Sequence, residues 1–261
     1  MARAGPLEAG LRARRDAGHK LLVPYLTGGL GPDWLTCVEA VAAAGADAVE
    51  VGIPFSDPIM DGPTIQESSA RALAQGATPA SVVGALGRVD AGVPIVVMTY
   101  YNVVFRAGHR RFARFLADQG VAGALVPDLP LGEIDEWAAA ADEAGVETVL
   151  MAAPTTPDDR LEAICARSRG WVYGVGLMGV TGERSMLAAS AGEMGKRLKA
   201  VTDKPVLIGI GVSSAEQAVE ASVQADGVIV GAALVRRLLE GGGAEEAAAF
   251  VGELRTGLDT C

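Results

Sequence analysis

Histidine and cysteine, the side chains that most often bind zinc or form a nucleophile–base pair, are scarce in this chain of 261 residues. The two histidines are His19 and His109, and neither lies near the end of a predicted strand. The three cysteines, Cys37, Cys165 and Cys261, are far apart and form no C-x-x-C pair. We therefore predict no metal site, no histidine-based triad and no disulfide framework, with the cysteines as ordinary thiols of a reducing compartment.

The chain also lacks an excess of basic residues and long apolar runs. The chain has 22 lysine and arginine residues against 32 aspartates and glutamates, a formal net charge of −10. Because nucleic-acid binding requires a basic surface, this balance argues against nucleic acid as the main partner. No uninterrupted apolar stretch reaches the roughly 18 residues of a membrane-spanning helix, and the N-terminus has no apolar signal segment. We expect a cytoplasmic protein without a membrane span.

Apolar residues are abundant and make up 50% of the chain. Eight short β-rich runs are almost continuously apolar, as expected for parallel strands that are covered on both faces. The segments between them have a helical period; Leu35, Val38 and Val41 share one helix face, and Thr78–Pro79 is a typical helix start. The predicted strands are residues 21–26, 48–53, 94–100, 123–128, 147–153, 171–176, 205–211 and 226–232.

Strand and helix thus alternate about eight times, with no proline-, glycine- or serine-rich linker between two halves of the chain. Eight such units in a chain near the typical ~250 residues predict an α/β fold of the closed (β/α)8 type, a TIM barrel. We expect residues 1–261 to form a single domain. An open doubly wound sheet is the alternative, but the first strand is not followed by the G-x-G-x-x-G loop of dinucleotide-binding sheets.

The segment VEVGIPFSDPIMDGP, residues 49–63, places acidic residues at the predicted catalytic end of the second strand. Glu50 alternates with Val49 and Val51, so it points to the opposite side of the strand from the two valines. In an apolar barrel mouth its pKa would rise toward neutrality, which suits proton transfer; pairing with a lysine or arginine, or simple hydration, is the alternative. Asp57 and Asp61 lie in the following loop, where either turn formation or catalysis would account for them.

Glycine is concentrated after the last three predicted strands. IGIG includes Gly209 and Gly211, and VGAAL includes Gly231 and Ala232. Barrels often bind phosphate at the ends of strands seven and eight through backbone N–H groups, although glycine is also simply tolerated there. The run GLMGVTGER, residues 176–184, has the composition of either a mobile lid or a long surface loop.

Five motifs together closely resemble the α subunit of tryptophan synthase, in the expected order from about residue 20 to 240. They are GADAVEVGIPFSDPIMDGPTIQESSARAL (45–73), VVMTYYN (96–102), PDLP (127–130), MGVTGER (178–184) and ADGVIVGAAL (225–234). The resemblance implies a (β/α)8 barrel that cleaves indole-3-glycerol phosphate to indole and glyceraldehyde 3-phosphate. It also implies a lyase without a cofactor of its own, assembled with a β subunit that holds pyridoxal phosphate in an α2β2 heterotetramer.

The resemblance also implies roles for individual residues. Glu50 and Asp61 match the catalytic acid–base pair, and Asp57 matches an aspartate beside the β-subunit interface. The remaining matches are substrate-binding positions, and the apolar mouth would hold a flat indole ring. These expected substrate-binding residues are Tyr25, Tyr100, Tyr173, Thr181, Gly182, Gly209, Gly211, Gly231 and Ala232.

The chain departs from the family pattern in two places. Ala232 stands where the family usually has serine, which removes a hydroxyl group from the expected phosphate site but leaves the backbone N–H. The early T-x-G-D-P pattern is replaced by TGGLGP, residues 27–32, without the aspartate, on the face where a partner would dock. Three functions are therefore weighed: an α subunit working with a β subunit, a free-standing lyase that releases indole, and a catalytically weak activator of the β subunit.

Overall fold

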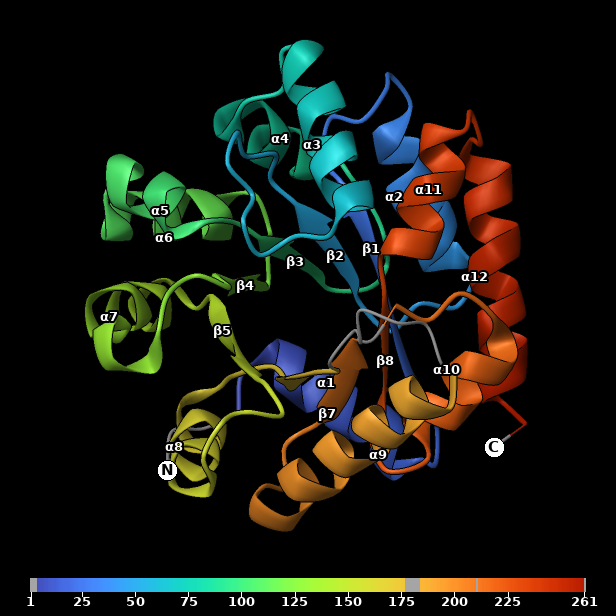
Figure 1. Ribbon diagram of the computed structural model, residues 1–261. Helices are drawn as coiled ribbons and strands as arrows, with labels where there is room; N and C mark the ends of the chain where they lie inside the picture. Colours follow the sequence, from blue (N-terminus) through green and yellow to red (C-terminus); the bar gives the residue numbers. More distant parts are fainter. Residues whose placement is uncertain (1–3, 177–183, 210, 261) are drawn as a thin grey trace.

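Eight parallel strands form a closed barrel in the computed structural model, which describes residues 4–176, 184–209 and 211–260 (Figure 1). Each strand pairs with the next along the chain, and β1 closes the ring by pairing with β8. The predicted barrel is therefore confirmed, and the alternative open sheet is wrong. The strands are β1 Leu21–Thr27, β2 Val49–Gly52, β3 Ile95–Met98, β4 Gly123–Leu125, β5 Glu147–Ala152, β6 Val172–Val175, β7 Val206–Gly209 and β8 Gly227–Val230.

The strands are buried on both faces, which is why their sequences are apolar without strict alternation. On β1, Leu21 and Val23 belong to the core cluster inside the barrel, whereas Leu22 and Leu26 belong to the larger cluster between the strands and the helices. Side chains alternate across a strand, so Tyr25 continues the inward-facing series of Leu21 and Val23. The register of the barrel pairs Tyr25 with Glu50 on β2.

Several strands end earlier than their apolar runs predict. The third was expected to continue to Tyr100 but ends at Met98, and the fourth ends at Leu125 rather than at residue 128. The eighth ends at Val230, because Ala232 already begins a helix. Tyr100 and Val126 are buried although they lie beyond their strands, so hydrophobicity alone does not reveal where the ladder stops.

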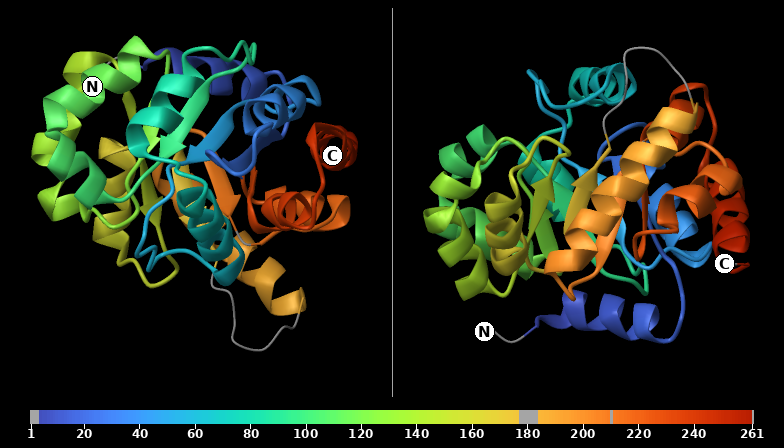
Figure 2. Two further views of the ribbon diagram at one scale, coloured as in Figure 1. Left: turned by 90° about the horizontal axis from the view of Figure 1, so that it is seen from above. Right: turned by 60° about the horizontal axis from the view of Figure 1, so that its bottom comes forward.

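Helices surround the barrel and cover its outer face (Figures 1 and 2). α4 begins as predicted at Thr78–Pro79, where the hydroxyl group of Thr78 accepts a hydrogen bond from the backbone N–H of Ser81. The helices are α1 Pro6–Asp16, α2 Trp34–Ala43, α3 Pro63–Ala74, α4 Pro79–Leu86, α5 Tyr101–Ala107, α6 His109–Asp118, α7 Asp135–Ala144, α8 Asp158–Arg167, α9 Arg184–Val201, α10 Ala215–Ser222, α11 Ala232–Leu239 and α12 Ala244–Leu258, with the short 3-10 helix η1 at Leu131–Glu133.

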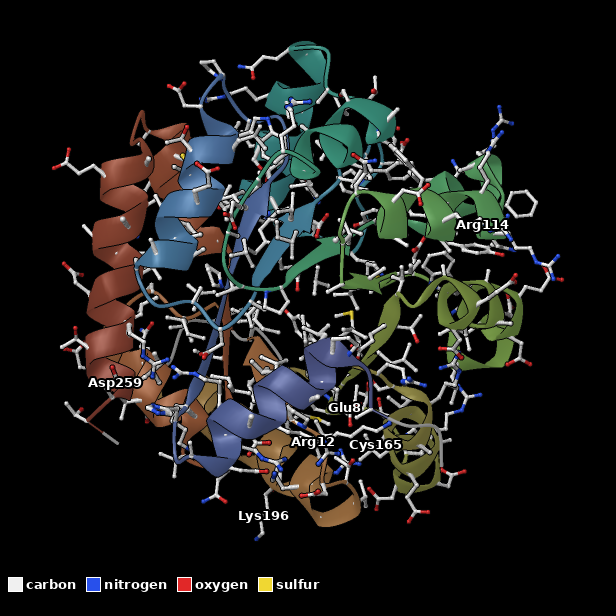
Figure 3. All side chains as sticks on the ribbon, turned by 180° about the vertical axis from the view of Figure 1, so that it is seen from behind. Glu8, Arg12, Arg114, Cys165, Lys196 and Asp259 are labelled. Carbon is white, nitrogen blue, oxygen red and sulfur yellow. The ribbon has the colours of Figure 1, made fainter. Side chains whose placement is uncertain are left out.

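α1 precedes the first strand and lies across the N-terminal end of the barrel (Figures 2 and 3). Its Leu7 and Leu11 are fully buried and join the core cluster inside the barrel. At its N-terminus the carboxylate of Glu147, the first residue of β5, accepts a hydrogen bond of 2.7 Å from the backbone N–H of Leu7. The helix therefore closes one end of the barrel and leaves the other end for a site.

The helices of the described part of the chain were also compared with the length and apolarity that a bilayer requires. None of those helices is both long enough and apolar enough to cross a membrane.

Candidate active site

Glu50 lies on β2 with its carboxyl group inside the barrel wall. The side chain is only 1% exposed, and its Oε2 atom has no hydrogen-bond partner among the described residues. Burial, followed by the nearby charge of Asp61, raises the pKa of Glu50 from 4.5 to about 8. Glu50 is therefore protonated at neutral pH and can act as an acid, and its conjugate base would be strong enough to take a proton back.

Asp61 reaches the same region from the loop between β2 and α3. Its Oδ2 accepts a hydrogen bond of 3.0 Å from the hydroxyl group of Tyr100, which itself accepts one of 3.0 Å from the backbone N–H of Met60. The Tyr100 ring stacks on Phe55 with 4.9 Å between centroids. Both ends of the loop are thus held by one tyrosine at the end of β3.

The pKa of Asp61 also rises, but less than that of Glu50. Burial raises the pKa from 3.8 to about 6, and the hydrogen bond from Tyr100 opposes the rise. At neutral pH the pair therefore consists of a protonated Glu50 and an ionised Asp61. Two carboxyl groups whose environments separate their pKa values in this way can take opposite roles in acid–base chemistry.

Two further tyrosines, Tyr25 on β1 and Tyr173 on β6, flank the carboxyl groups. Each side chain leans over a glycine of the neighbouring strand: a β-carbon on Gly52 would overlap the Tyr25 hydroxyl, and one on Gly209 would overlap the Tyr173 hydroxyl. Burial raises the pKa of both phenols, and the charges of Glu50 and Asp61 raise it further. Both phenols therefore stay neutral throughout the physiological range.

A glycine-rich edge lies at the ends of β7 and β8. Gly211 has a φ of 76°, a conformation that favours glycine, and Gly231 precedes the first residue of α11, Ala232. Among the described residues no side chain caps this helix, so its first N–H groups are available to an anion. The two arginines of α11 are used elsewhere, since Arg236 bonds to the Thr64 hydroxyl and Arg237 lies over the ring of Phe250.

Comparison with known proteins identifies this arrangement. A family model described as "Tryptophan synthase alpha chain" matches residues 11–256. The chain belongs to the tryptophan synthase alpha chain family. The resemblance seen in the sequence motifs is thereby confirmed.

Individual relatives agree with the family model. A tryptophan synthase alpha chain from Picosynechococcus sp. is 44% identical over 244 residues, which cover 91% of this chain and 92% of the relative. One from Streptomyces coelicolor is 45% identical over 235 residues, covering 88% of this chain and 86% of the relative. A solved structure of Mycobacterium tuberculosis tryptophan synthase superposes with a TM-score of 0.90 at 40% identity, over 98% of this chain and 99% of that chain.

Asp57, Thr181 and Gly182 are three further residues that the resemblance implied for the site. Asp57 is exposed, and its recorded hydrogen bond is to the neighbouring Ser56 hydroxyl, at 2.6 Å, so the structure does not bring it to the carboxyl pair. Thr181 and Gly182 lie outside the described residues. Tyr25 on β1, Tyr173 on β6 and Tyr100 in the loop just after β3, by contrast, meet around Glu50 and Asp61.

Sequence reasoning missed Gly52 and Ser68, which shape the site together with Thr27. Gly52 makes room for the Tyr25 ring, and Thr27 and Ser68 form a buried hydroxyl pair 2.6 Å apart beside it. Glycine and hydroxyl residues are common at strand ends and on helices, so no pattern in the chain singles these out. In the part of the chain that the structure describes, no His, Cys, Asp or Glu residues are grouped as a metal would require.

Proposed function

We propose that the barrel end carrying Glu50 and Asp61 performs the reaction of the tryptophan synthase alpha chain family. As a member of this family the chain is a carbon–carbon lyase that cleaves indole-3-glycerol phosphate to indole and glyceraldehyde 3-phosphate and passes indole to a β subunit. The observation that supports the assignment of residues is the opposite protonation of two buried carboxyl groups in one barrel mouth. The reaction needs an acid and an anion at the same time.

The reaction is a retro-aldol cleavage, and its proton transfers suit this pair. Protonated Glu50 donates its proton to C3 of the indole ring, which leaves the ring cationic and turns Glu50 into a carboxylate. Asp61, already ionised, accepts a hydrogen bond from the indole N–H and stabilises that positive charge.

The second half of the reaction returns the site to its starting state. The Glu50 carboxylate removes the proton of the 3′-hydroxyl group, and that oxygen forms the aldehyde as the bond between C3 and the glycerol chain breaks. The bonding electrons go to the ring and neutralise its charge, which releases indole and glyceraldehyde 3-phosphate. Glu50 ends protonated, so no co-reactant is required.

The rest of the mouth is proposed to bind the two ends of the substrate. The rings of Tyr25, Tyr100 and Tyr173 form walls for the indole, with Gly209 giving the Tyr173 ring its place. Phosphate would be held by backbone N–H groups around Gly211 and at the start of α11, after Gly231, where none of the side chains that the structure describes forms a competing cap. Ala232 supplies only its N–H. Thr181 and Gly182 are proposed as lid residues by sequence match.

We further propose an α2β2 assembly in which pyridoxal phosphate belongs to the β subunit alone. Support comes from exposed apolar side chains in the loop after β2 and on α5. Ile59 is 80% exposed, Met60 55% and Phe105 63%, and Asp57 lies in the same loop as the first two. The location of the protein in the cytoplasm and the single domain over residues 1–261 stay predictions.

Indole release from indole-3-glycerol phosphate by the purified chain, with and without a tryptophan synthase β subunit, tests the proposal. Slow release alone and a large rise with the partner are expected. Fast release that ignores the partner would indicate a free-standing lyase and contradict the proposed assembly. No release under either condition would contradict the proposed catalytic pair and favour a role as an activator of the β subunit.

A further inference from the structure

The segment that forms α5 and α6 has basic side chains and no acidic ones, although the chain as a whole is acidic. Between Asp90 and Asp118 the sequence contains no aspartate or glutamate, whereas such residues make up 32 of the 261 in the chain. The basic residues in the same stretch are Arg106, His109, Arg110, Arg111 and Arg114. This segment therefore differs in sign from the formal net charge of −10 of the whole chain.

Helix α7 packs beside α6 and neutralises part of this charge. The carboxylate of Glu143 lies 3.4 Å from Arg110 and 3.5 Å from Arg114. The carboxylate of Glu136 lies 3.4 Å from the ring of His109. Three of the five basic side chains therefore have a carboxylate beside them.

Arg106 and Arg111 are the two that remain. Both are exposed, and neither has a hydrogen bond or an ion pair to the residues that the structure describes. Gly108, with a φ of 85°, ends α5 and precedes α6, so the two arginines stand on either side of one corner. Arg106 borders a groove of about 390 Å³ beside the start of α4, and Arg111 borders a hollow of about 570 Å³ beside α7. Side chains of a partner thus have room next to both cations.

An exposed aromatic ring lies next to the two arginines. Phe105 is 63% exposed, and its ring contacts those of Tyr101, with 6.0 Å between centroids, and His109, with 6.4 Å. Tyr101 and His109 also share a hydrogen bond of 3.0 Å, which holds these two rings together. An aromatic side chain with fixed neighbours, next to arginines, has the composition typical of protein–protein interfaces.

The corner between α5 and α6 is continuous with the apolar surface proposed above for the β subunit. Ile59 and Met60 are exposed in the loop after β2. The N–H of Met60 donates to the hydroxyl group of Tyr100, and Tyr100 directly precedes α5. The surface therefore leads from the loop, through Phe105, to the two arginines. Interfaces of this kind have an apolar centre and a polar rim.

We propose that the corner between α5 and α6 is an electrostatic docking element for the β subunit: Phe105 anchors the contact, and Arg106 and Arg111 attract an acidic face of that subunit. The inference rests on the proposed α2β2 assembly. Because the chain as a whole is acidic, an acidic face is repelled by most of the surface and attracted at this corner. The corner thus favours one docking orientation and speeds the encounter.

The rate of association of the full chain with the cognate β subunit, measured by surface plasmon resonance at low and high salt, tests the proposal. At an ionic strength of about 0.01 M, where the Debye length is about 30 Å, the double variant Arg106→Glu/Arg111→Glu should associate about tenfold more slowly than the unmodified chain. Its dissociation rate should change at most about twofold, because rim charges act mainly on the encounter. At about 1 M salt the charges are screened, so the two association rates should become equal.

Three further variants separate charge from other causes. Arg88→Glu/Lys196→Glu is the matched control: it reverses two exposed charges between α4 and β3 and on α9, so its association rate should stay within about twofold. Arg106→Lys/Arg111→Lys keeps both charges and should associate like the unmodified chain, since steering depends on charge rather than on the guanidinium shape. Phe105→Ala should instead raise the dissociation rate. Thermal unfolding of each variant confirms that the compared chains are folded.

The outcomes distinguish this inference from the proposed assembly. If the charge-reversed arginine variant associates at low salt as fast as the matched control, the docking element is wrong and the assembly stands. Faster association of that variant would mean that the partner face is basic, which also contradicts the proposal. If the unmodified chain does not bind the β subunit at all, the assembly is wrong and the docking element with it.

Discussion

Asp47 and Asp226 at the N-terminal end of the barrel and Glu50 at the catalytic end are buried carboxyl groups in opposite surroundings. At the N-terminal end, Asp47 accepts hydrogen bonds from the backbone N–H of Leu22 at 2.8 Å and from Arg14 at 2.9 Å. Asp226 accepts from the N–H of Val206 at 2.8 Å and from Lys199 at 2.9 Å. At the catalytic end, Glu50 is more deeply buried than these residues, yet it keeps an oxygen without a partner in the described structure.

The difference separates stability from function. A carboxylate that receives several hydrogen bonds and a cation is stabilised in its ionised form and joins the elements around it. The same group without those partners is costly to ionise, and that cost raises its pKa to where proton transfer occurs. Substitutions at the two ends should therefore affect different measurements.

Glu50→Gln should have the largest effect, and on turnover. Glutamine keeps the shape of the side chain but cannot donate and recover a proton, so kcat should fall by at least ~10² to 10⁴, the usual contribution of a general acid–base group. Substrate binding should be largely retained, which isothermal titration would show. A kcat close to that of the unmodified chain would contradict the expectation that Glu50 serves catalysis whereas the acids at the other end serve stability.

Asp47→Ala should leave catalysis alone and cost stability. Arg255, which is 8% exposed, loses a carboxylate 3.3 Å away in this variant and keeps only Asp259 as a described ion-pair partner. Breaking a buried ion pair typically costs about 3–5 kcal/mol, measurable as a lower midpoint of urea unfolding. Asp203→Ala is the matched control at the same end, because its ion pairs to Arg12 and Arg15 are exposed and worth at most about 1 kcal/mol. Equal losses in the two variants would contradict the expectation.

Glu50→Gln should also make the protein more stable at alkaline pH. The folded pKa of Glu50 is about 8, raised from 4.5, so between these values the unfolded chain has released a proton that the folded chain still holds. Folding stability from this group is complete below pH ~4.5 and is lost as the pH rises toward 8. Glutamine does not titrate, so the free energy of unfolding of the variant should rise relative to that of the unmodified chain as the pH increases from about 4.5 to about 8. Thermal unfolding of both chains at pH 5 and pH 8 measures this relative rise. The same difference in unfolding midpoint between the two chains at both pH values would contradict the raised pKa.

Ala232→Ser should give the smallest effect, and it tests phosphate binding at the catalytic end. The added hydroxyl group stands at the start of α11 and can donate to a bound phosphate. A hydrogen bond to a charged group is worth about 1.5–3 kcal/mol, so KM should fall roughly tenfold with kcat little changed. Ala244→Ser, at the first position of α12, is the control and should leave KM as it is. An unchanged or higher KM in Ala232→Ser would contradict the proposed phosphate site.

Much of the fold could be predicted because its signals are local. Continuous apolar runs separated by helical periods indicate parallel strands covered on both faces, and eight repeats indicate a closed barrel. The ends of the strands were less accessible, as Tyr100 and Ala232 show, since a buried loop residue is as apolar as a strand residue. α1 closing the N-terminal end was not foreseen, because only the barrel determines where it packs.

The candidate site, like the fold, could be predicted from the sequence only in part. The motif residues Glu50 and Asp61 could be selected from the sequence, because an acid inside an apolar strand and a proline-rich loop are visible in one stretch of chain. Their different protonation could not, since it depends on Tyr100 bonding Asp61 and on the absence of a described partner for Glu50 Oε2.

The sequence by itself determined the alternation of strand and helix, the closed barrel that eight such units form, and the end of the barrel where the acids stand. The tertiary structure alone decided which groups meet there. Tyr25 lies opposite Glu50, and Thr27 of the same strand bonds to Ser68, only because the barrel closes and α3 packs beside β1. Burial and hydrogen bonding act between residues distant in sequence, and they set the pKa of an acid as no local pattern can.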